Sequence, residues 1–307
     1  MRISVTLTVV SGAFMLVGSQ PSVHAADFCR LSANAAVKAC QATARHDGAI
    51  ADGKCLNLAT PLERRICLLE ATANAKDALK TCGEEASFRK ASCGRFGPDP
   101  YSPEINPANF TTTINNPYFP LKPGTTFIYE AQKLSGFEHV EFAVTHETRV
   151  LNGVTCVVIH DTSVVNGVPH EDTLDFFAQD LQGNVWYFGE ATHEFVDGLI
   201  LNIGGTFLSG RDGAKPGIVM KAHPTVGDYY RQESDLGNAE DIAEVLSLNA
   251  SASTPYGNFA NALQTKETTP LEPSLVENKF YAAGVGQVLT FKPATGESVP
   301  LVRVVVE

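Results

Sequence analysis

Residues 171–190 read EDTLDFFAQDLQGNVWYFGE, in which two runs of alternating aromatic and polar residues flank the polar sequence DLQGN. Successive side chains of a β-strand point to opposite faces of a sheet, so this alternation is typical of a strand with one face in a core. A short glycine-containing turn between two such runs predicts an antiparallel hairpin. The stretch therefore indicates a β fold for the part of the chain around it.

Strand patterns of this kind recur from Thr125 to Glu307, separated by turn residues such as Asn152-Gly153 and Asn166-Gly167. Roughly ten strands linked by hairpins form an antiparallel sheet that must curl on itself or split in two. We therefore predict a mainly antiparallel β domain over residues 125–307, folded as a barrel, a half-barrel or a sandwich. Residues 201–227 are rich in glycine and are expected to form a long loop over one end of this domain.

Six of the seven cysteines lie upstream of the β domain, separated by 10, 14, 11, 14 and 10 residues. In an oxidising compartment six clustered cysteines imply three disulfides, and zinc is disfavoured because no CxxC pair occurs. The intervening segments are rich in Ala, Leu, Lys and Glu, which favours helix. The near-symmetric spacing predicts a Cys-rich helical hairpin over residues 26–97, an α+β fold overall, and nested disulfides: Cys29 with Cys93, Cys40 with Cys82, and Cys55 with Cys67.

Two further segments complete the expected organisation. Arg2, the apolar run Ile3–Val17 and a polar stretch ending at Ala25 are typical of a secretory signal peptide over residues 1–25. Residues 98–124 are rich in proline, which fixes φ and removes a backbone donor, so we expect an extended connector that drapes over the β domain. The chain is thus predicted to be secreted or periplasmic.

Charge and hydropathy restrict the partners. The formal net charge is −11 at pH 7, and an acidic chain repels phosphate backbones, so nucleic acid is not expected as a partner. After the signal peptide no run of about 20 apolar residues occurs, so we expect no membrane span. The sequence predicts no cofactor and leaves the oligomeric state open.

Strand register within residues 171–190 identifies polar side chains on apolar faces. A three-residue loop at 181–183 would pair Asp180 with Asn184 and set Leu174 opposite Glu190. The same register sets Glu171 opposite His193. Glu190 would then close an otherwise apolar face, formed by Leu174, Phe176, Ala178, Trp186 and Phe188.

Two other strands place a polar residue in an apolar row. Alternation puts His146 in a row with Val144, and Glu244 in a row with Ile242. A carboxylate in an apolar row responds with a raised pKa, a partner or access to water. If Glu190, Glu244 and His146 converge, they supply general acid and base groups, with Asp175 as a further candidate. The alternative is that each lies at a strand end and reaches solvent.

Aromatic residues supply the candidate ligand contacts: Trp186, Tyr187, Phe176 and Tyr230. In the expected strand TCVVIHDTSV (residues 155–164) both rows are largely apolar, so either His160 or Asp161 should point inward. A metal site built from His146, His193 or His223 stays open. Cys156, alone in a Val-rich strand, is expected to be a buried, inert thiol. No GxSxG, phosphate-loop, dinucleotide-binding or HExxH motif occurs.

Five passages carry a resemblance to known proteins: NPYFPLKPGTTFIYE, EDTLDFFAQDLQGNVWYFGE, DGAKPGIVMKAHPTVGDYYRQE, NAEDIAEVLSL and TKETTPLEPSLVENKFYAAGVG. They resemble an uncharacterised family of exported bacterial proteins with a Pro-rich connector and a C-terminal antiparallel β domain, over roughly residues 100–290. The resemblance implies one continuous β domain and assigns no catalytic role. Asn278 departs from the family pattern, which has His at this position.

Three functional hypotheses follow, and the sequence does not decide whether the protein is an enzyme. The first is an exported protein that binds a small or lipophilic ligand in the cavity of a curled sheet. The second is an extracellular hydrolase or lyase that uses paired carboxylates on a polymer such as a polysaccharide. The third is a surface or matrix structural protein built around the stapled helical segment.

Overall fold

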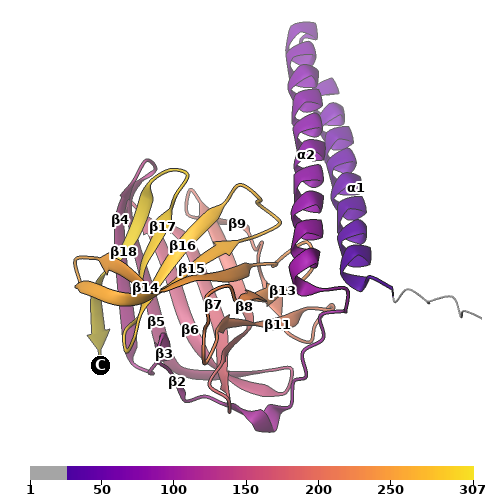
Figure 1. Ribbon diagram of the computed structural model, residues 1–307. Coiled ribbons are helices and arrows are strands. Elements are labelled where there is room, and N and C mark those ends of the chain that lie inside the picture. Colours follow the sequence, from indigo (N-terminus) through magenta and orange to yellow (C-terminus); the bar gives the residue numbers. More distant parts are fainter. Residues whose placement is uncertain (1–25) are drawn as a thin grey trace, which may run out of the picture.

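The computed structural model describes residues 26–307 (Figure 1). Two antiparallel helices, α1 (Phe28–Leu56) and α2 (Pro61–Phe96), project from a large antiparallel sheet that is nearly closed into a barrel. The predicted α+β fold is therefore confirmed. The expected signal peptide at residues 1–25 lies outside the described residues.

The helical hairpin is held together by disulfides over a thin core. Its buried apolar residues are mainly alanines, which bring the two helices close together but bury little apolar area. A capping box starts α2, in which Thr60 and Glu63 bond each other's backbone N–H, and Pro61 follows the cap. The nested disulfides are confirmed: Cys29–Cys93, Cys40–Cys82 and Cys55–Cys67.

Eighteen strands and one short 3-10 helix follow the hairpin among the described residues. Their bounds are η1 (Pro107–Asn109), β1 (Phe110–Thr111), β2 (Ile114–Asn116), β3 (Phe119–Leu121), β4 (Thr125–Lys133), β5 (Gly136–Leu151), β6 (Val154–Val165), β7 (Val168–Asp180), β8 (Val185–Val196), β9 (Leu199–Asn202), β10 (Phe207–Leu208), β11 (Lys215–Met220), β12 (Tyr229–Arg231), β13 (Glu233–Ser234), β14 (Ile242–Ser253), β15 (Asn258–Thr268), β16 (Val276–Ala282), β17 (Gly286–Lys292) and β18 (Glu297–Val306).

The sheet nearly closes at a seam between its two end strands. The strand order is β12-β14-β15-β16-β17-β18-β4-β5-β6-β7-β8-β11-β13. Its ends, β12 and β13, are consecutive in the chain and separated only by Gln232. At the seam β11 lies against this residue, because a Cβ on Gly217 would lie 2.3 Å from the carbonyl carbon and oxygen of Gln232.

Two apolar clusters lie on the two faces of the sheet. The larger one contains residues from β4 to β8 and from β14 to β18, together with Phe119 and Leu121 of the β2–β3 hairpin. The smaller one includes Phe176 and Phe188 and is covered by Phe110 and Ile105 of the Pro-rich connector. Part of the connector thus packs on the outer face of the sheet.

The expectation of a long loop over residues 201–227 was wrong. This stretch forms part of β9, then β10 and β11, and all three strands pair with β8. The turn glycines suggest a loop, whereas backbone pairing with an unoccupied edge of β8 satisfies the N–H and C=O groups of the short strands.

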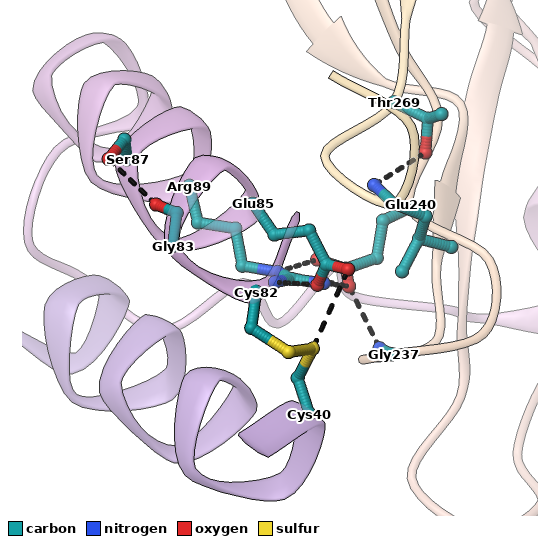
Figure 2. A network of polar contacts seen from close by, with 10 residues as sticks. Cys40, Cys82, Gly83, Glu85, Ser87, Arg89, Gly237, Glu240 and Thr269 are labelled. Atoms are coloured by element: carbon teal, nitrogen blue, oxygen red, sulfur yellow. Dashed lines mark hydrogen bonds and ion pairs between the residues drawn. A yellow bond between two sulfur atoms is a disulfide. The ribbon is translucent and has the colours of Figure 1, made fainter. Parts of the chain in front are cut away.

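A buried ion network joins the hairpin to the barrel (Figure 2). The Arg89 guanidinium of α2 lies 2.9 Å from a Glu85 oxygen and 2.7 Å from a Glu240 oxygen, and Glu240 also accepts the N–H of Gly237. Nearby, Ser92 bonds the hydroxyl of Tyr229 on β12 at 2.9 Å. These contacts fix α2 beside the seam of the sheet. Over residues 26–307, neither helix has a stretch long and apolar enough to cross a membrane.

Candidate functional site

The interior of the curled sheet contains a cavity of about 470 Å³. This volume lies in the range of sites that hold small molecules. The β2–β3 hairpin contributes to its wall through Phe119 and Leu121. The aromatic residues of the wall are Phe119, Phe127, Tyr129, Phe142, Phe177, Tyr187 and Tyr281.

Carboxyl groups outnumber cations on the polar part of the wall. Three lysines line the cavity, and each is bound by a glutamate: Lys133 by Glu138 at 2.6 Å, Lys279 by Glu267 at 2.7 Å, and Lys292 by Glu277 at 3.3 Å. Six further carboxyl groups have no Lys or Arg within ion-pair distance among residues 26–307: Asp161, Glu171, Asp175, Glu190, Glu233 and Asp241.

A β-bulge brings Glu190 next to Asp175. The predicted pairing of Asp180 with Asn184 is confirmed, and Ala178 lies opposite Trp186, but the register shifts between Phe177 and Phe176. Asp175 therefore pairs with Glu190, and the predicted pairing of Leu174 with Glu190 was wrong. The predicted pairing of Glu171 with His193 was also wrong, because Glu171 lies opposite Glu194.

The cause of the bulge is the close approach of β10 to Gly189. This residue has φ 147°, and a Cβ on it would lie 2.3 Å from the carbonyl oxygen of Phe207. The extra residue turns Glu190 from the outer apolar face to the cavity. A glycine inside a strand pattern is a sequence signal for a bulge, so Gly189 could have indicated this change.

Tyr187 connects the two carboxyl groups. Its hydroxyl oxygen lies 2.5 Å from Oδ1 of Asp175 and 2.7 Å from Oε2 of Glu190. A phenol has one proton and can donate to only one of these oxygens. A hydrogen on one of the two carboxyl groups would make both contacts hydrogen bonds, and burial favours that protonated form. In that form the unit is a neutral acid and a second carboxyl group joined by a phenol.

Burial and mutual repulsion favour the protonated acids. Burial, followed by the charge of Asp175, raises the pKa of Glu190 to about 8. Burial and the charge of Asp161 raise the pKa of Asp175 well above its usual range. Burial and the charge of Glu171 raise the pKa of Asp161 to about 7. Carboxyl groups with such pKa values exchange protons near neutral pH.

Gln232 adds an amide to the cavity wall at the seam. Gln232 lines the cavity, the residue is only 5% exposed, and its side-chain amide makes no hydrogen bond within residues 26–307. Buried amides are almost always bonded, because losing water without a replacement partner costs free energy. The sequence patterns did not single out Gln232.

The candidate acid and base residues Glu190, Glu244 and His146 do not converge: of the three, only Glu190 lines the cavity. The side chain of His146 is 73% exposed and lies 4.0 Å from Glu307, since an irregularity in β5 after Val144 ends the predicted alternation. Glu244 lies on the face of β14 that α2 covers and pairs with Arg95 at 2.8 Å. Strand alternation alone could not reveal that a helix covers this face.

The other predicted residues divide between the two faces of the sheet. Asp175 and Tyr187 line the cavity, and Asp161 resolves the earlier choice, because His160 faces outward and pairs with Asp172 at 3.0 Å. Trp186 and Phe176 belong to the outer apolar cluster. Tyr230 is in the interior core, with a hydroxyl that has no partner within the described chain, but it is not a lining residue.

The structure also bears on the metal and thiol predictions. No group of three or more His, Cys, Asp or Glu side chains in residues 26–307 has an arrangement suited to a metal ion. Cys156 is fully buried, and burial raises the pKa of its thiol to about 12, so its expected inertness is supported.

Sequence reasoning missed Glu233, Asp241 and Lys279 as lining residues. Glu233 and Asp241 lie at the seam, which forms only when the sheet curls. Lys279 lies on β16, where charged and polar neighbours leave no row of apolar residues in which a polar side chain would stand out. A signal was present for Asp161, which follows Val157 and Ile159 at alternate positions.

Comparison with known proteins adds little to this geometry. No family model matches the sequence, and no curated protein matches it. Among solved structures, the chain is similar to a candidate lipoprotein from Parabacteroides distasonis, with 12% identity and a TM-score of 0.34 over 61% of this chain and 98% of that chain. The candidate site therefore rests on the geometry of this chain.

Proposed function

We propose that the protein is an exported small-molecule-binding protein that holds its ligand inside the curled sheet. One observation carries this proposal: the cavity of about 470 Å³ combines aromatic walls with polar groups whose hydrogen-bonding capacity is unused, Gln232 among them. Small-molecule sites commonly combine apolar walls with a few placed polar groups in this way.

The disulfides support a location outside the cytoplasm. Three disulfides staple the helical hairpin, and such bonds form and persist in oxidising compartments such as the periplasm or the extracellular space. The signal-peptide pattern at residues 1–25 agrees with this location. We therefore place the binding function in the periplasm or the secreted fraction.

A matched pair of filling variants tests the binding function. Ser163 lines the cavity, whereas its neighbour Thr162 points to the other face of β6. The neutral fluorophore N-phenyl-1-naphthylamine is titrated into wild-type, Ser163→Trp and Thr162→Trp protein. We expect saturable binding that Ser163→Trp abolishes and Thr162→Trp preserves.

The smaller substitution Val140→Phe also fills the cavity, because Val140 lines it, and it serves as a second test if Ser163→Trp does not fold. Circular dichroism confirms that each variant is folded. The proposal fails if wild-type protein shows no saturable binding, or if the filled but folded variants bind the fluorophore as well as the wild type does.

A second candidate function is acid and base catalysis on a glycan. The observation that favours it is the bridge through Tyr187. Its hydroxyl lies 2.5 Å from an Asp175 oxygen and 2.7 Å from a Glu190 oxygen, so these two carboxyl oxygens are separated by no more than the sum of the two distances. Retaining glycosidases use carboxyl groups separated by about 5 Å, with one of them protonated.

An assay for released reducing ends on a panel of polysaccharides tests this second candidate. We expect turnover that Glu190→Gln removes, with binding of the fluorophore retained. Wild-type protein that binds the fluorophore but cleaves none of the panel would leave binding as the function and reject catalysis.

A further inference from the structure

We propose that the interior cavity selects a small organic cation, an amine or guanidinium compound with an aromatic or aliphatic body. The inference rests on the proposed binding function and names its class of ligand. Its basis is the juxtaposition of unpaired carboxyl groups, a free amide and stacked aromatic rings on one wall of the cavity.

The charge distribution on the wall is the first observation. Each lysine of the cavity already forms an ion pair with a glutamate: Glu138, Glu267 or Glu277. The charge of Lys279 also lowers the pKa of Asp161, but Lys279 is paired directly with Glu267, with its ammonium group 2.7 Å from a Glu267 oxygen. The remaining acids have no cation of their own within the described chain, and ionised acids in a buried site need one.

Protons take the place of that cation in the ligand-free protein. Asp175 and Glu190 both lie within hydrogen-bond distance of the Tyr187 hydroxyl, and burial favours a proton on this pair. A ligand ammonium or guanidinium would replace such a proton with a permanent positive charge and donate N–H groups to the same oxygens. Binding of the cation should therefore release protons to the solvent.

Gln232 is the second and independent observation. The residue is only 5% exposed and lines the cavity, and its side-chain amide makes no hydrogen bond within the described part of the chain. Its carbonyl oxygen is an acceptor, which is what an N–H donor from a ligand requires. Glu233, the next residue, is one of the unpaired acids, so the amide and a carboxyl group enter the cavity from the same seam.

The aromatic wall defines the rest of the ligand. The rings of Phe177 and Tyr187 are stacked, with centroids 4.6 Å apart, and Phe119 lies 5.5 Å from Phe177. The hydroxyl of Tyr187 bonds both Asp175 and Glu190, so the aromatic wall adjoins the acids. Aromatic faces attract cations and pack against apolar bodies, which suits an amphipathic amine and disfavours an anion such as a fatty acid.

An organic cation fits these residues better than a metal ion. The acids are distributed around a cavity of about 470 Å³, and no cluster of His, Cys, Asp and Glu in residues 26–307 is arranged to hold a metal. Divalent cations bind through several oxygens at short distances, which requires a tighter arrangement. A calcium arm in the experiment tests this choice.

The experiment compares ligands that differ in charge. Isothermal titration at pH 7.5 uses three ammonium compounds (2-phenylethylamine, tryptamine and spermidine), the neutral 2-phenylethanol, the anionic 3-phenylpropionate, and calcium chloride. We expect at least one ammonium compound to bind roughly tenfold or more tightly than the alcohol. Its apparent enthalpy should differ between phosphate and Tris buffers, because protons are released on binding.

Matched variants locate the effect. Asp175→Asn and Glu190→Gln keep the shape of each side chain and should reduce the preference for the ammonium compound toward that of the alcohol. Asp172→Asn changes an acid on the outer face of the same strand, which pairs with His160, and should leave the preference unchanged. Gln232→Leu should weaken ammonium binding more than binding of the neutral fluorophore.

The outcomes separate this inference from the binding function. If the fluorophore binds in the cavity but no ammonium compound is preferred to the alcohol, the inference is overturned and the binding function stands. If calcium or the anion binds in place of the amines, the inference is also overturned. If neither fluorophore nor amine binds, both proposals fall.

Discussion

Gly189 determines which face of the sheet Glu190 occupies. With a side chain at this position, β10 could not approach β8, since the Cβ would meet the carbonyl oxygen of Phe207. Without the bulge, period-two alternation would return Glu190 to the outer apolar cluster, and Tyr187 would lose one of its two acids. A single backbone position thus assembles the acid pair.

Gly189→Ala should destabilise the protein by roughly 1 to 3 kcal/mol, because it adds a steric clash to a φ that favours glycine. Urea unfolding measures the change. Gly198→Ala is the matched control, since Gly198 has φ 75° with no atom within 4 Å of the added Cβ. Equal losses in both variants would show that the contact with β10 contributes nothing.

At the scale of elements, a buried cation is central to the contacts that fix α2 to the sheet. Arg89 reaches Glu240 in the loop before β14, and Figure 2 shows Glu85 and the Cys40–Cys82 disulfide on the helical side of the same network. Because Arg89 binds two acids, removing it leaves two largely buried carboxylates, Glu85 and Glu240, without their cation.

Arg89→Met should therefore cost about 3 kcal/mol or more of unfolding free energy, as expected when one partner of a buried ion network is removed. Lys80→Met on the same helix is the control, because the Lys80–Glu84 pair is exposed and surface pairs contribute little. Thermal unfolding and limited proteolysis of the hairpin measure both variants. A change in Arg89→Met no larger than in the control would mean that the network does not hold α2 in place.

For the whole molecule, the acidic interior sets the pH dependence of stability. Burial and neighbouring charges raise the pKa of Asp161 to about 7, of Glu190 to about 8 and of Asp241 to about 6. Between the unfolded carboxyl pKa, about 4, and these folded values, the folded state binds more protons than the unfolded state. Stability is therefore greatest at the acidic end of this window and declines as pH rises toward 8.

The midpoint temperature of thermal unfolding should decrease as the pH is raised from about 5 to about 8. The decrease per pH unit should be smaller in Glu190→Gln, because residue 190 no longer titrates. Asp172→Asn, on the outer face, should keep the wild-type slope. A midpoint that rises over this range would contradict the protonated interior.

How much the sequence could predict depends on the range of the interactions involved. Residues near each other in the chain gave reliable patterns: alternation around Trp186 predicted the hairpin, and the cysteine spacing predicted the nested disulfides. Glu244 was misplaced because its face is covered by α2, a segment more than a hundred residues away in the chain. Gln232 and Glu233 became lining residues only through curling of the sheet, which no local pattern contains.

The pairing of β4 with β18 has a consequence for the order of folding. Thr125 lies opposite Val306, so closing the barrel joins segments separated by most of the β domain. Contacts of such long sequence separation are slow to form, because loop-closure entropy opposes them until neighbouring contacts are in place. The helical hairpin contains its own contacts between α1 and α2 and should fold early, whereas the interior cavity should be the last part of the molecule to form.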